Sequence, residues 1–174
     1  MKELEQIMKK VFSDKDFKPE QIPALDLYMD QVLTLVNDGL SDNKRNDDEK
    51  LFTKTMINNY SKEKLICQIK GKKYTHQHIM QMLCVYQLKQ MLILSDVKQL
   101  TGREDVDFEA CWKNYLEMKD KIKKSIPEQI AQNMLVDLSN PEKRLSLCLA
   151  LSAVSTYMRR LAESIIDETI ETEA

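Results

Sequence analysis

Residues 53–75 read TKTMINNYSKEKLICQIKGKKYT, and the pattern of this stretch changes halfway along. In its first half, the apolar residues Met56, Ile57 and Tyr60 recur at helical spacing, and Thr53 is a good N-cap. Polar residues recur at the same helical spacing, i, i+3, i+4 and i+7, on another face of the helix. These residues are Thr55, Asn58, Asn59 and Lys62. The stretch therefore predicts a short helix over residues 53–63 with one wholly polar face.

The second half of the stretch has a different period. Leu65, Cys67 and Ile69 alternate with other residues, and a Lys70-Gly71 pair follows them. Alternation followed by a glycine is typical of a strand that enters a turn. We therefore expect residues 65–75 to form a small β-hairpin, or wing.

Outward from this stretch, the pattern is helical almost everywhere. The chain has only 3 Gly and 4 Pro, too few for a turn-rich all-β fold. Thr75 and Ser95 are candidate N-caps, Gly102 is a candidate helix end, and Ser125-Ile-Pro127-Glu matches a capping box. Helices are predicted over residues 2–12, 23–36, 53–63, 75–91, 96–100, 105–124, 125–138 and 141–170. The fold class is all-α, or mainly helical, with at most one small β-hairpin.

Charge is distributed unevenly along the 174 residues. The formal net charge of the whole chain is −2, but residues 1–49 carry −5, residues 50–103 carry +8 and residues 104–174 carry −5. A basic block of this kind is typical of a surface that binds nucleic acid. The other interpretation is a solvated face on a helical protein, and the charge count alone leaves both open.

Targeting, metal and catalytic motifs are missing from the sequence. The N-terminal residues contain no apolar signal core, and the longest uncharged stretches, 74–88 and 145–158, are shorter than the ~20 apolar residues that cross a bilayer. The four cysteines form no CxxC pair, and His76 and His78 would point to different sides of a helix. No phosphate-loop, nucleophile-elbow or dinucleotide motif occurs. We expect a cytoplasmic protein that is not an enzyme, is not bound to a membrane and has no cofactor.

Three segments resemble the DNA-binding domain of MerR-type regulators. Met56-Ile-Asn-Asn-Tyr60-Ser-Lys-Glu-Lys64-Leu-Ile66 resembles the MerR segment T-I-R-Y-Y-E-x-x-G-L-L. Lys72-Lys-Tyr-Thr75 is similar to its wing segment R-x-Y-S, and Leu92-Ile-Leu-Ser-Asp-Val-Lys-Gln-Leu100 to its closing F-S-L-E-E-I-x-x-L. The motifs LYMDQV (27–32), TKTMINNY (53–60) and KKYTHQHI (72–79) are similar to a bacterial family known as domain of unknown function 1836, over roughly residues 23–130.

The resemblance to MerR-type regulators implies a MerR-like winged helix-turn-helix over residues 23–103 and a role as a DNA-binding transcriptional regulator. The helix 53–63 would enter the major groove, and the wing would contact phosphates. Candidate contacts to bases or backbone are Thr55, Asn58, Asn59 and Lys62. Candidate contacts to phosphates are Lys54, Lys70, Lys72 and Lys73, and Tyr74 would anchor the wing, with its hydroxyl within reach of a phosphate. No Arg lies between Lys50 and Gly102, so adenine readout by Asn58 and Asn59 would replace guanine readout by Arg.

The remaining segments frame this domain. Residues 1–22 are expected to form an N-terminal helix and connector, and residues 104–174 a helical region that either dimerises or packs on the rest of the chain. The expected partner is double-stranded DNA, bound by a monomer or a homodimer, and the sequence does not identify a small-molecule effector. The alternative hypothesis is a helical protein-interaction module, whose partner would dock on the polar face around Asn58.

Overall fold

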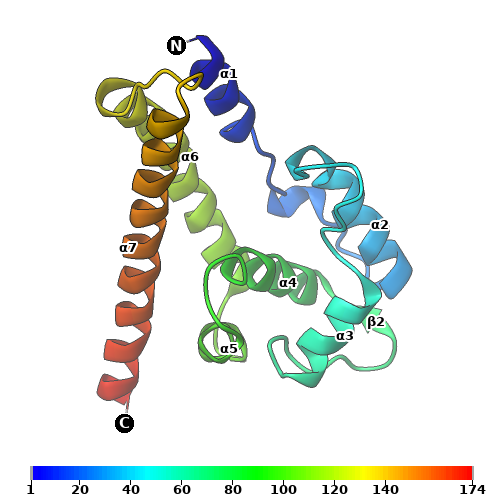
Figure 1. Cartoon of the computed structure of the whole chain (residues 1–174). Coiled ribbons are helices and arrows are strands. Elements are labelled where there is room, and N and C mark those ends of the chain that lie inside the picture. Colours follow the sequence, from blue (N-terminus) through cyan, green and yellow to red (C-terminus); the bar gives the residue numbers. More distant parts are fainter. Residues whose placement is uncertain (1, 174) are drawn as a thin grey trace. The chain divides into compact units, whose positions relative to one another are not determined.

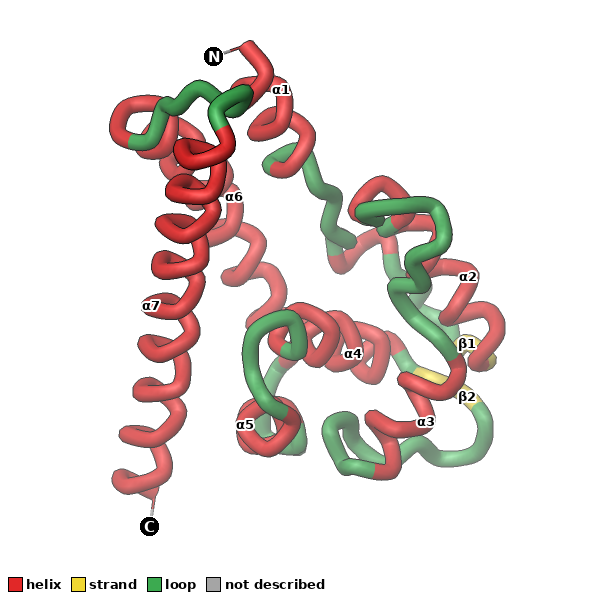
Figure 2. Tube along the Cα trace, in the orientation of Figure 1, coloured by secondary structure: helices red, strands yellow, loops and turns green. Residues whose placement is uncertain are grey.

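The protein is almost entirely helical (Figures 1 and 2), as its sequence predicts. The computed structural model describes residues 2–173, with side chains described for residues 3–168. Within that range the α-helices are α1 (Lys2–Val11), α2 (Met29–Gly39), α3 (Lys54–Lys62), α4 (His76–Leu88), α5 (Leu94–Thr101), α6 (Phe108–Asn133) and α7 (Pro141–Glu173). Two short 3-10 helices, η1 (Pro19–Gln21) and η2 (Ser41–Asn43), and two strands, β1 (Leu27–Tyr28) and β2 (Lys73–Tyr74), complete the structure. No helix of residues 2–173 is both long and apolar enough to cross a bilayer.

The chain divides into two compact units. The central unit comprises residues 15–116, and the terminal unit comprises residues 1–14 together with residues 117–174. The first contains every element from η1 to α5 and the first turns of α6. The second contains α1, the rest of α6, and α7.

Helix α4 is the centre of the central unit. Its residues 79–85 are all buried, so this helix has no solvent-exposed face over nearly two turns. A helix that is apolar on all sides is stable only when other elements surround it. Helix α5 and strand β2 contact α4 directly, and Val32 of α2, Ile57 of α3 and Val97 of α5 are each 0% exposed in the same unit.

A buried hydrogen bond joins the two ends of the central unit. The indole Nε1 of Trp112 in α6 donates to the carbonyl oxygen of Phe17 at 2.7 Å. The ring of Phe17 packs directly on Gly39, where a β-carbon would overlap it. Glycine is therefore required at the end of α2 because the Phe17 ring fills the space of a side chain.

The β-structure differs from the hairpin predicted for residues 65–75. Strand β2 pairs antiparallel with β1, with Leu27 opposite Tyr74 and Tyr28 opposite Lys73. Residues 65–72 are turns and irregular chain. The hairpin prediction was wrong because the partner strand comes from more than forty residues earlier, and a local alternation pattern carries no information about such a partner.

Two predicted helix boundaries also need correction. The helix predicted to begin near Pro23 begins at Met29, because Leu27 and Tyr28 are extended and pair with β2. The helices predicted over residues 105–124 and 125–138 form one helix, α6, which contains Pro127. A proline inside a helix is unfavourable, but continuing the helix places Ile130 against the apolar cluster of the terminal unit, so packing outweighs the local capping preference.

The terminal unit has a small apolar cluster and a half-buried charge network. Leu4 and Met8 of α1 pack with Leu147 of α7. The carboxylate of Asp14 pairs with Lys119 and with Lys123, the latter at 2.8 Å. Burial would raise the pKa of Asp14, but hydrogen bonds from the two ammonium groups outweigh it, and the pKa lies below its usual value.

Candidate nucleic-acid interface

Helix α3 is fixed at its start by a side-chain cap and by aromatic packing. The hydroxyl of Thr53 accepts a hydrogen bond from the backbone N–H of Met56 at 3.2 Å, as the sequence predicts. The preceding residue, Phe52, is buried with its ring centroid 4.8 Å from that of Tyr86 in α4. The first turn of α3 is therefore attached to the central helix of the unit.

The long connection between α2 and α3 is closed by Asn37. Its amide oxygen accepts from the backbone N–H of Phe52 at 3.1 Å, and its amide nitrogen donates to the carbonyl of Phe52 at 3.0 Å. The amide thereby pairs with both backbone groups of one residue, as a neighbouring strand would. Helix-turn-helix units normally join their two helices by a turn of about 3–4 residues. Here Asn37 holds the start of α3 against α2 although the loop is longer.

The end of α3 is a Schellman motif built around Lys64. The backbone N–H of Leu65 donates to the carbonyl of Tyr60 at 2.8 Å, and that of Lys64 to Ser61 at 3.2 Å. Lys64 has a φ of 57°, and it is the only residue other than glycine with positive φ in the described chain. This is the position at which the MerR pattern has glycine, which adopts this conformation without steric cost.

The inner face of α3 is fully used in packing. Ile57 and Tyr60 are buried, which confirms Tyr60 as a core residue. The ammonium of Lys89 donates to the Tyr60 hydroxyl at 3.2 Å and lies 5.1 Å from the ring centroid. Burial is the main cause that raises the pKa of Tyr60 to about 12. Tyr60 therefore stays a neutral hydroxyl at physiological pH and takes no part in the exposed face.

The outer face of α3 is exposed and polar. The exposed residues are the five predicted for this helix, Lys54, Thr55, Asn58, Asn59 and Lys62. Within residues 2–173, the side chains of Thr55, Asn58 and Asn59 have no hydrogen-bond partner, and neither lysine is paired with a carboxylate. The two amides present donors and acceptors outward, which is the chemistry that pairs with the N6 and N7 edge of adenine.

The loop that leads into β2 carries the remaining predicted lysines. Lys70, Lys72 and Lys73 are all exposed, and Gly71, with a φ of 75°, forms the turn between the first two. The ammonium of Lys73 lies 5.2 Å from the centroid of the Tyr28 ring, a cation–π contact across the two paired strands. Lys70 and Lys72 have no carboxylate partner among the described residues. The Tyr28 contact could not be predicted from the sequence, because it depends on the β1–β2 pairing.

Tyr74 lies apart from the lysines. Its side chain is 5% exposed and its ring meets His78 of α4 edge-on, with centroids 6.4 Å apart. His78 completes a capping box: its Nδ1 accepts from the backbone N–H of Thr75 at 3.1 Å, and the Thr75 hydroxyl accepts from the N–H of His78. Tyr74 therefore attaches the loop to α4 and does not share the exposed surface of Lys70, Lys72 and Lys73.

A second anchor of the same loop is buried. Gln81, 1% exposed, accepts a hydrogen bond from the backbone N–H of Cys67 at 2.9 Å and donates to the carbonyl of Thr101 at the end of α5. One amide thus ties the chain after α3 to the end of α5. The uncharged, apolar context of Gln81 in α4 gave no signal of this role in the sequence.

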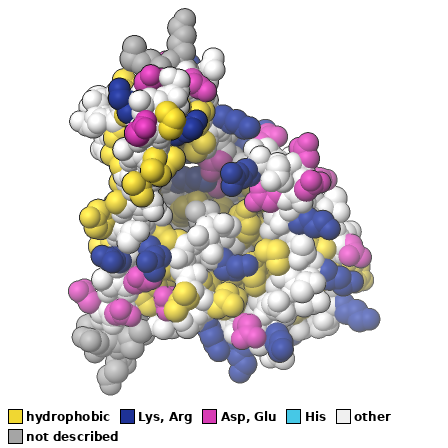
Figure 3. Space-filling model, viewed as in Figure 1, with side chains coloured by type: hydrophobic (Ala, Val, Ile, Leu, Met, Phe, Trp, Pro, Cys, Tyr) yellow, Lys and Arg dark blue, Asp and Glu magenta, His cyan; other side chains and the backbone are white. Residues whose placement is uncertain are grey.

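Basic and acidic side chains are unevenly distributed over the central unit. On the face seen in Figure 3, basic side chains lie along the lower right edge, where α3 and the loop before β2 are in Figure 1. Acidic side chains gather higher up, where the loop after α2 lies, and single acidic groups occur between the basic ones. Both α3 and β2 contact α2, so one helix supports the two basic segments.

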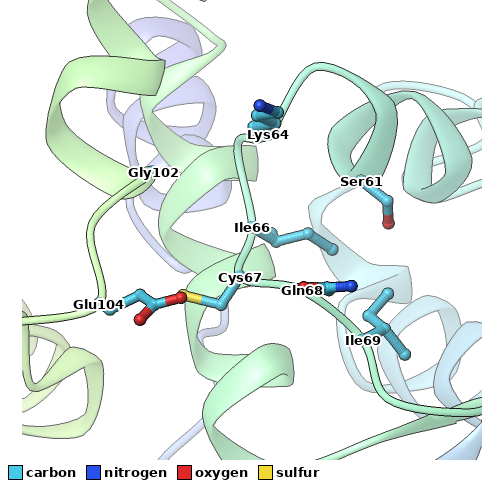
Figure 4. Close-up of a pocket in the computed structure, with 8 residues that line it drawn as sticks. All are labelled: Ser61, Lys64, Ile66, Cys67, Gln68, Ile69, Gly102 and Glu104. Atoms are coloured by element: carbon cyan, nitrogen blue, oxygen red, sulfur yellow. The ribbon is translucent and has the colours of Figure 1, made fainter.

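A pocket lies next to the end of α3. It has a volume of about 580 Å³ and lies between the end of α3, the loop after it and the segment that follows α5 (Figure 4). Gly102 allows this close approach, since a β-carbon there would lie 2.7 Å from the carbonyl oxygen of Lys64. The lining residues are Ser61, Lys64, Ile66, Cys67, Gln68, Ile69, Gly102 and Glu104. The described residues contain no cluster of three or more His, Cys, Asp or Glu side chains that could hold a metal ion.

These features define a small helical domain with a two-stranded sheet and with exposed lysines on α3 and on the loop before β2. Residues 17–110, more than half of the chain, match the family described as a domain of unknown function (DUF1836). The chain belongs to this family. No curated protein and no solved structure matches the chain.

Proposed function

We propose that the protein is a cytoplasmic DNA-binding transcriptional regulator that acts without catalysis. Helix α3 would present Thr55, Asn58 and Asn59 to base edges, and the loop before β2 would place lysines on the flanking phosphates, as in a MerR-like winged helix-turn-helix. The observation that carries the proposal is that the basic side chains of this surface are exposed and not paired with carboxylates among the described residues. Those of α3 and of Lys70 and Lys72 are exposed and have no carboxylate partner in the described chain, so their charge is available to a polyanion.

The rigid packing of α3 and of the loop before β2 favours sequence-specific DNA binding over nonspecific electrostatic binding. Helix α3 is capped at both ends and its inner face is buried, and the loop before β2 is tied down at Cys67 and at Tyr74. Rigid elements hold contact groups at fixed geometry, which sequence readout requires and nonspecific binding does not. The two segments also share α2 as their support.

The test is the salt dependence of binding to duplex DNA, measured by fluorescence anisotropy. A Lys70→Ala, Lys72→Ala double variant should weaken binding about equally for all sequences and lower the slope of log K against log salt by about 2, since each phosphate contact contributes ~0.9. This pair leaves the contact between Lys73 and Tyr28 intact. The matched control, Lys9→Ala with Lys10→Ala, removes the same charge from exposed positions of α1 and should leave the slope unchanged.

Base readout needs a separate measurement. Asn58→Ala should relax the preference at one base-pair position by about 1–3 kcal/mol in a binding-site selection, without changing the salt slope. Absence of any duplex binding at 50 mM salt would refute the proposed function. Equal slopes for the lysine variant and its control would refute the role of the loop.

One observation favours a second candidate, the protein-interaction module. A groove of about 350 Å³ runs between α3 and the start of α5, and Ile93 and Leu94 at its edge are 63% and 49% exposed. Exposed apolar side chains beside a groove are typical of a surface that binds protein. Loss of a protein partner on Ile93→Ser, together with no DNA binding by the unchanged chain, would favour this candidate.

A further inference from the structure

Helix α7 is long and very poorly covered by its own chain. It spans 33 residues, about 50 Å at 1.5 Å per residue. Of its described side chains, residues 141–168, only Leu147 and Ile166 are buried. Most helices in water depend on packing of one face for their stability, so a helix of this length with two buried side chains needs a further partner.

The uncovered face continues a face that is already internal. Leu147 packs against Leu4 and Met8 of α1 in the apolar cluster of the terminal unit. From Leu147, apolar residues recur at intervals of 4, 3, 4 and 3 residues, which keeps them within about 40° of the same direction on the helix. These residues are Leu151, Val154, Met158 and Leu161, and all of them are exposed.

The middle of α7 also lacks charge. Residues 145–158 contain no Lys, Arg, Asp or Glu, and they include the exposed residues Leu145, Leu149 and Tyr157. A solvent-facing helix normally carries charged residues on its outer face. Four turns without any charge indicate a segment that is buried in the functional state of the protein.

We propose that α7 is the interface of a homodimer, in which the α7 helices of two copies pack antiparallel along the stripe Leu151–Leu161. The distribution of charge favours a second copy as the occupant. At the start of α7, Lys143 and Arg144 outnumber Glu142, and Asp167 and Glu168 lie near its end. An antiparallel copy places each basic end beside an acidic end, whereas a parallel copy places like charges together.

Side-chain size fits the same arrangement. With Arg144 opposite Asp167, the twofold axis falls between residues 155 and 156. Leu161 then lies opposite Ala150 of the second copy, and both residues lie on the stripe face. Large residues facing small ones is the condition for interlocking helices, and a twofold interface repeats each such pair.

The exposed stripe supplies most of the apolar area that a stable dimer needs. Five apolar side chains of α7 between Leu151 and Leu161 lie on or beside the stripe and are 37% to 63% exposed, about half on average. With roughly 150 Å² for a large apolar side chain, they offer about 380 Å² of apolar surface per copy. A standard interface buries about 800 Å² per partner, of which roughly 60% is apolar, so these side chains supply most of that apolar area.

The experiment measures the mass of the full chain in solution, without DNA, by light scattering coupled to size exclusion. We expect the mass of a dimer at 50 µM. The double variant Met158→Glu, Leu161→Glu should give a monomer with unchanged helical circular dichroism, because both side chains are already exposed. The matched control is Ile93→Glu, an equally exposed apolar position in the central unit, and it should remain a dimer.

Cross-linking tests the orientation. In the antiparallel arrangement, the two copies of residue 154 lie near the twofold axis, whereas the two copies of Cys148 are about 20 Å apart along the helices. A Val154→Cys, Cys148→Ser variant should therefore be joined by a short bis-maleimide at residue 154, and the unchanged chain should not be joined at Cys148. Efficient joining at Cys148 would overturn the antiparallel arrangement.

A monomer at 50 µM would overturn the dimer, whether α7 is then covered by the central unit or by another protein. Neither measurement involves DNA, so the dimer and the proposed function can each be refuted without the other.

Discussion

Replacement of Gln81 by leucine should destabilise the central unit strongly, although the two side chains are similar in size. The amide of Gln81 accepts from the N–H of Cys67 at 2.9 Å and donates to the carbonyl of Thr101. Gln81→Leu would leave both backbone groups buried without a partner. Each such group costs about 1–3 kcal/mol, so the free energy of unfolding should fall by about 2–6 kcal/mol. Small proteins are stable by about 5–15 kcal/mol in total, and the loss is therefore easily measured.

The assay is urea unfolding followed by tryptophan fluorescence. Trp112 is the one tryptophan of the sequence and is buried in the central unit, so its emission reports on that unit alone. The matched control is Gln77→Leu, an exposed glutamine one turn earlier in α4, which should change the free energy of unfolding by less than about 0.5 kcal/mol. A loss below about 1 kcal/mol for Gln81→Leu would show that the amide does not hold the loop after α3 to the end of α5.

Three further predictions concern single residues. Lys64→Gly should raise the free energy of unfolding by about 1 kcal/mol in the same urea assay, because glycine adopts the positive φ of this position without steric cost; a decrease would contradict the strain argument. Burial lowers the pKa of His78 and outweighs the opposing polar contacts. The unfolded chain therefore binds the proton more tightly than the folded chain, and the melting temperature should fall as the pH drops below about 6.5. His78→Gln keeps an acceptor for the capping box and should flatten this pH dependence, and an unchanged dependence would assign it to other groups. A hydrogen bond from the Cys84 thiol lowers the pKa of Cys111, so Cys111 should react readily with iodoacetamide at pH 7, and Cys84→Ala should slow that reaction in peptide mass spectra; an unaltered rate would exclude the hydrogen bond as the cause.

Several features that depend on neighbouring residues could be predicted from the sequence, although the candidate caps Ser95 and Ser125 lie inside α5 and α6. Thr53 and Thr75 were identified as N-caps because the capping hydrogen bond reaches only three residues along the chain. Asn140 likewise accepts from the N–H of Lys143 at 2.8 Å at the start of α7. The exposed face of α3 followed from helical periodicity, because its inner face had to take the apolar residues.

Features that depend on distant residues could not be predicted. The pairing of β1 with β2 joins Leu27 to Tyr74, and two-residue strands are too short to show alternation. The continuation of α6 through Pro127 depends on packing around Ile130, which no local pattern reveals. The same limit applies to the site: the polar face of α3 was visible in the sequence, whereas the burial of Tyr74 and the roles of Asn37 and Gln81 required the fold.

The hydrogen bond between Trp112 and Phe17 has a consequence for how this domain can be rearranged. It holds the first and last segments of the central unit side by side, and almost the whole span matched by the family lies between them. A domain whose entry and exit lie together can be inserted into a surface loop of an unrelated host, or permuted by joining its ends and opening it elsewhere, without altering its interior. Within this chain the central unit already has that relation to the terminal unit, whose α1 precedes it and whose α7 follows it, so the protein is itself one domain inserted into another.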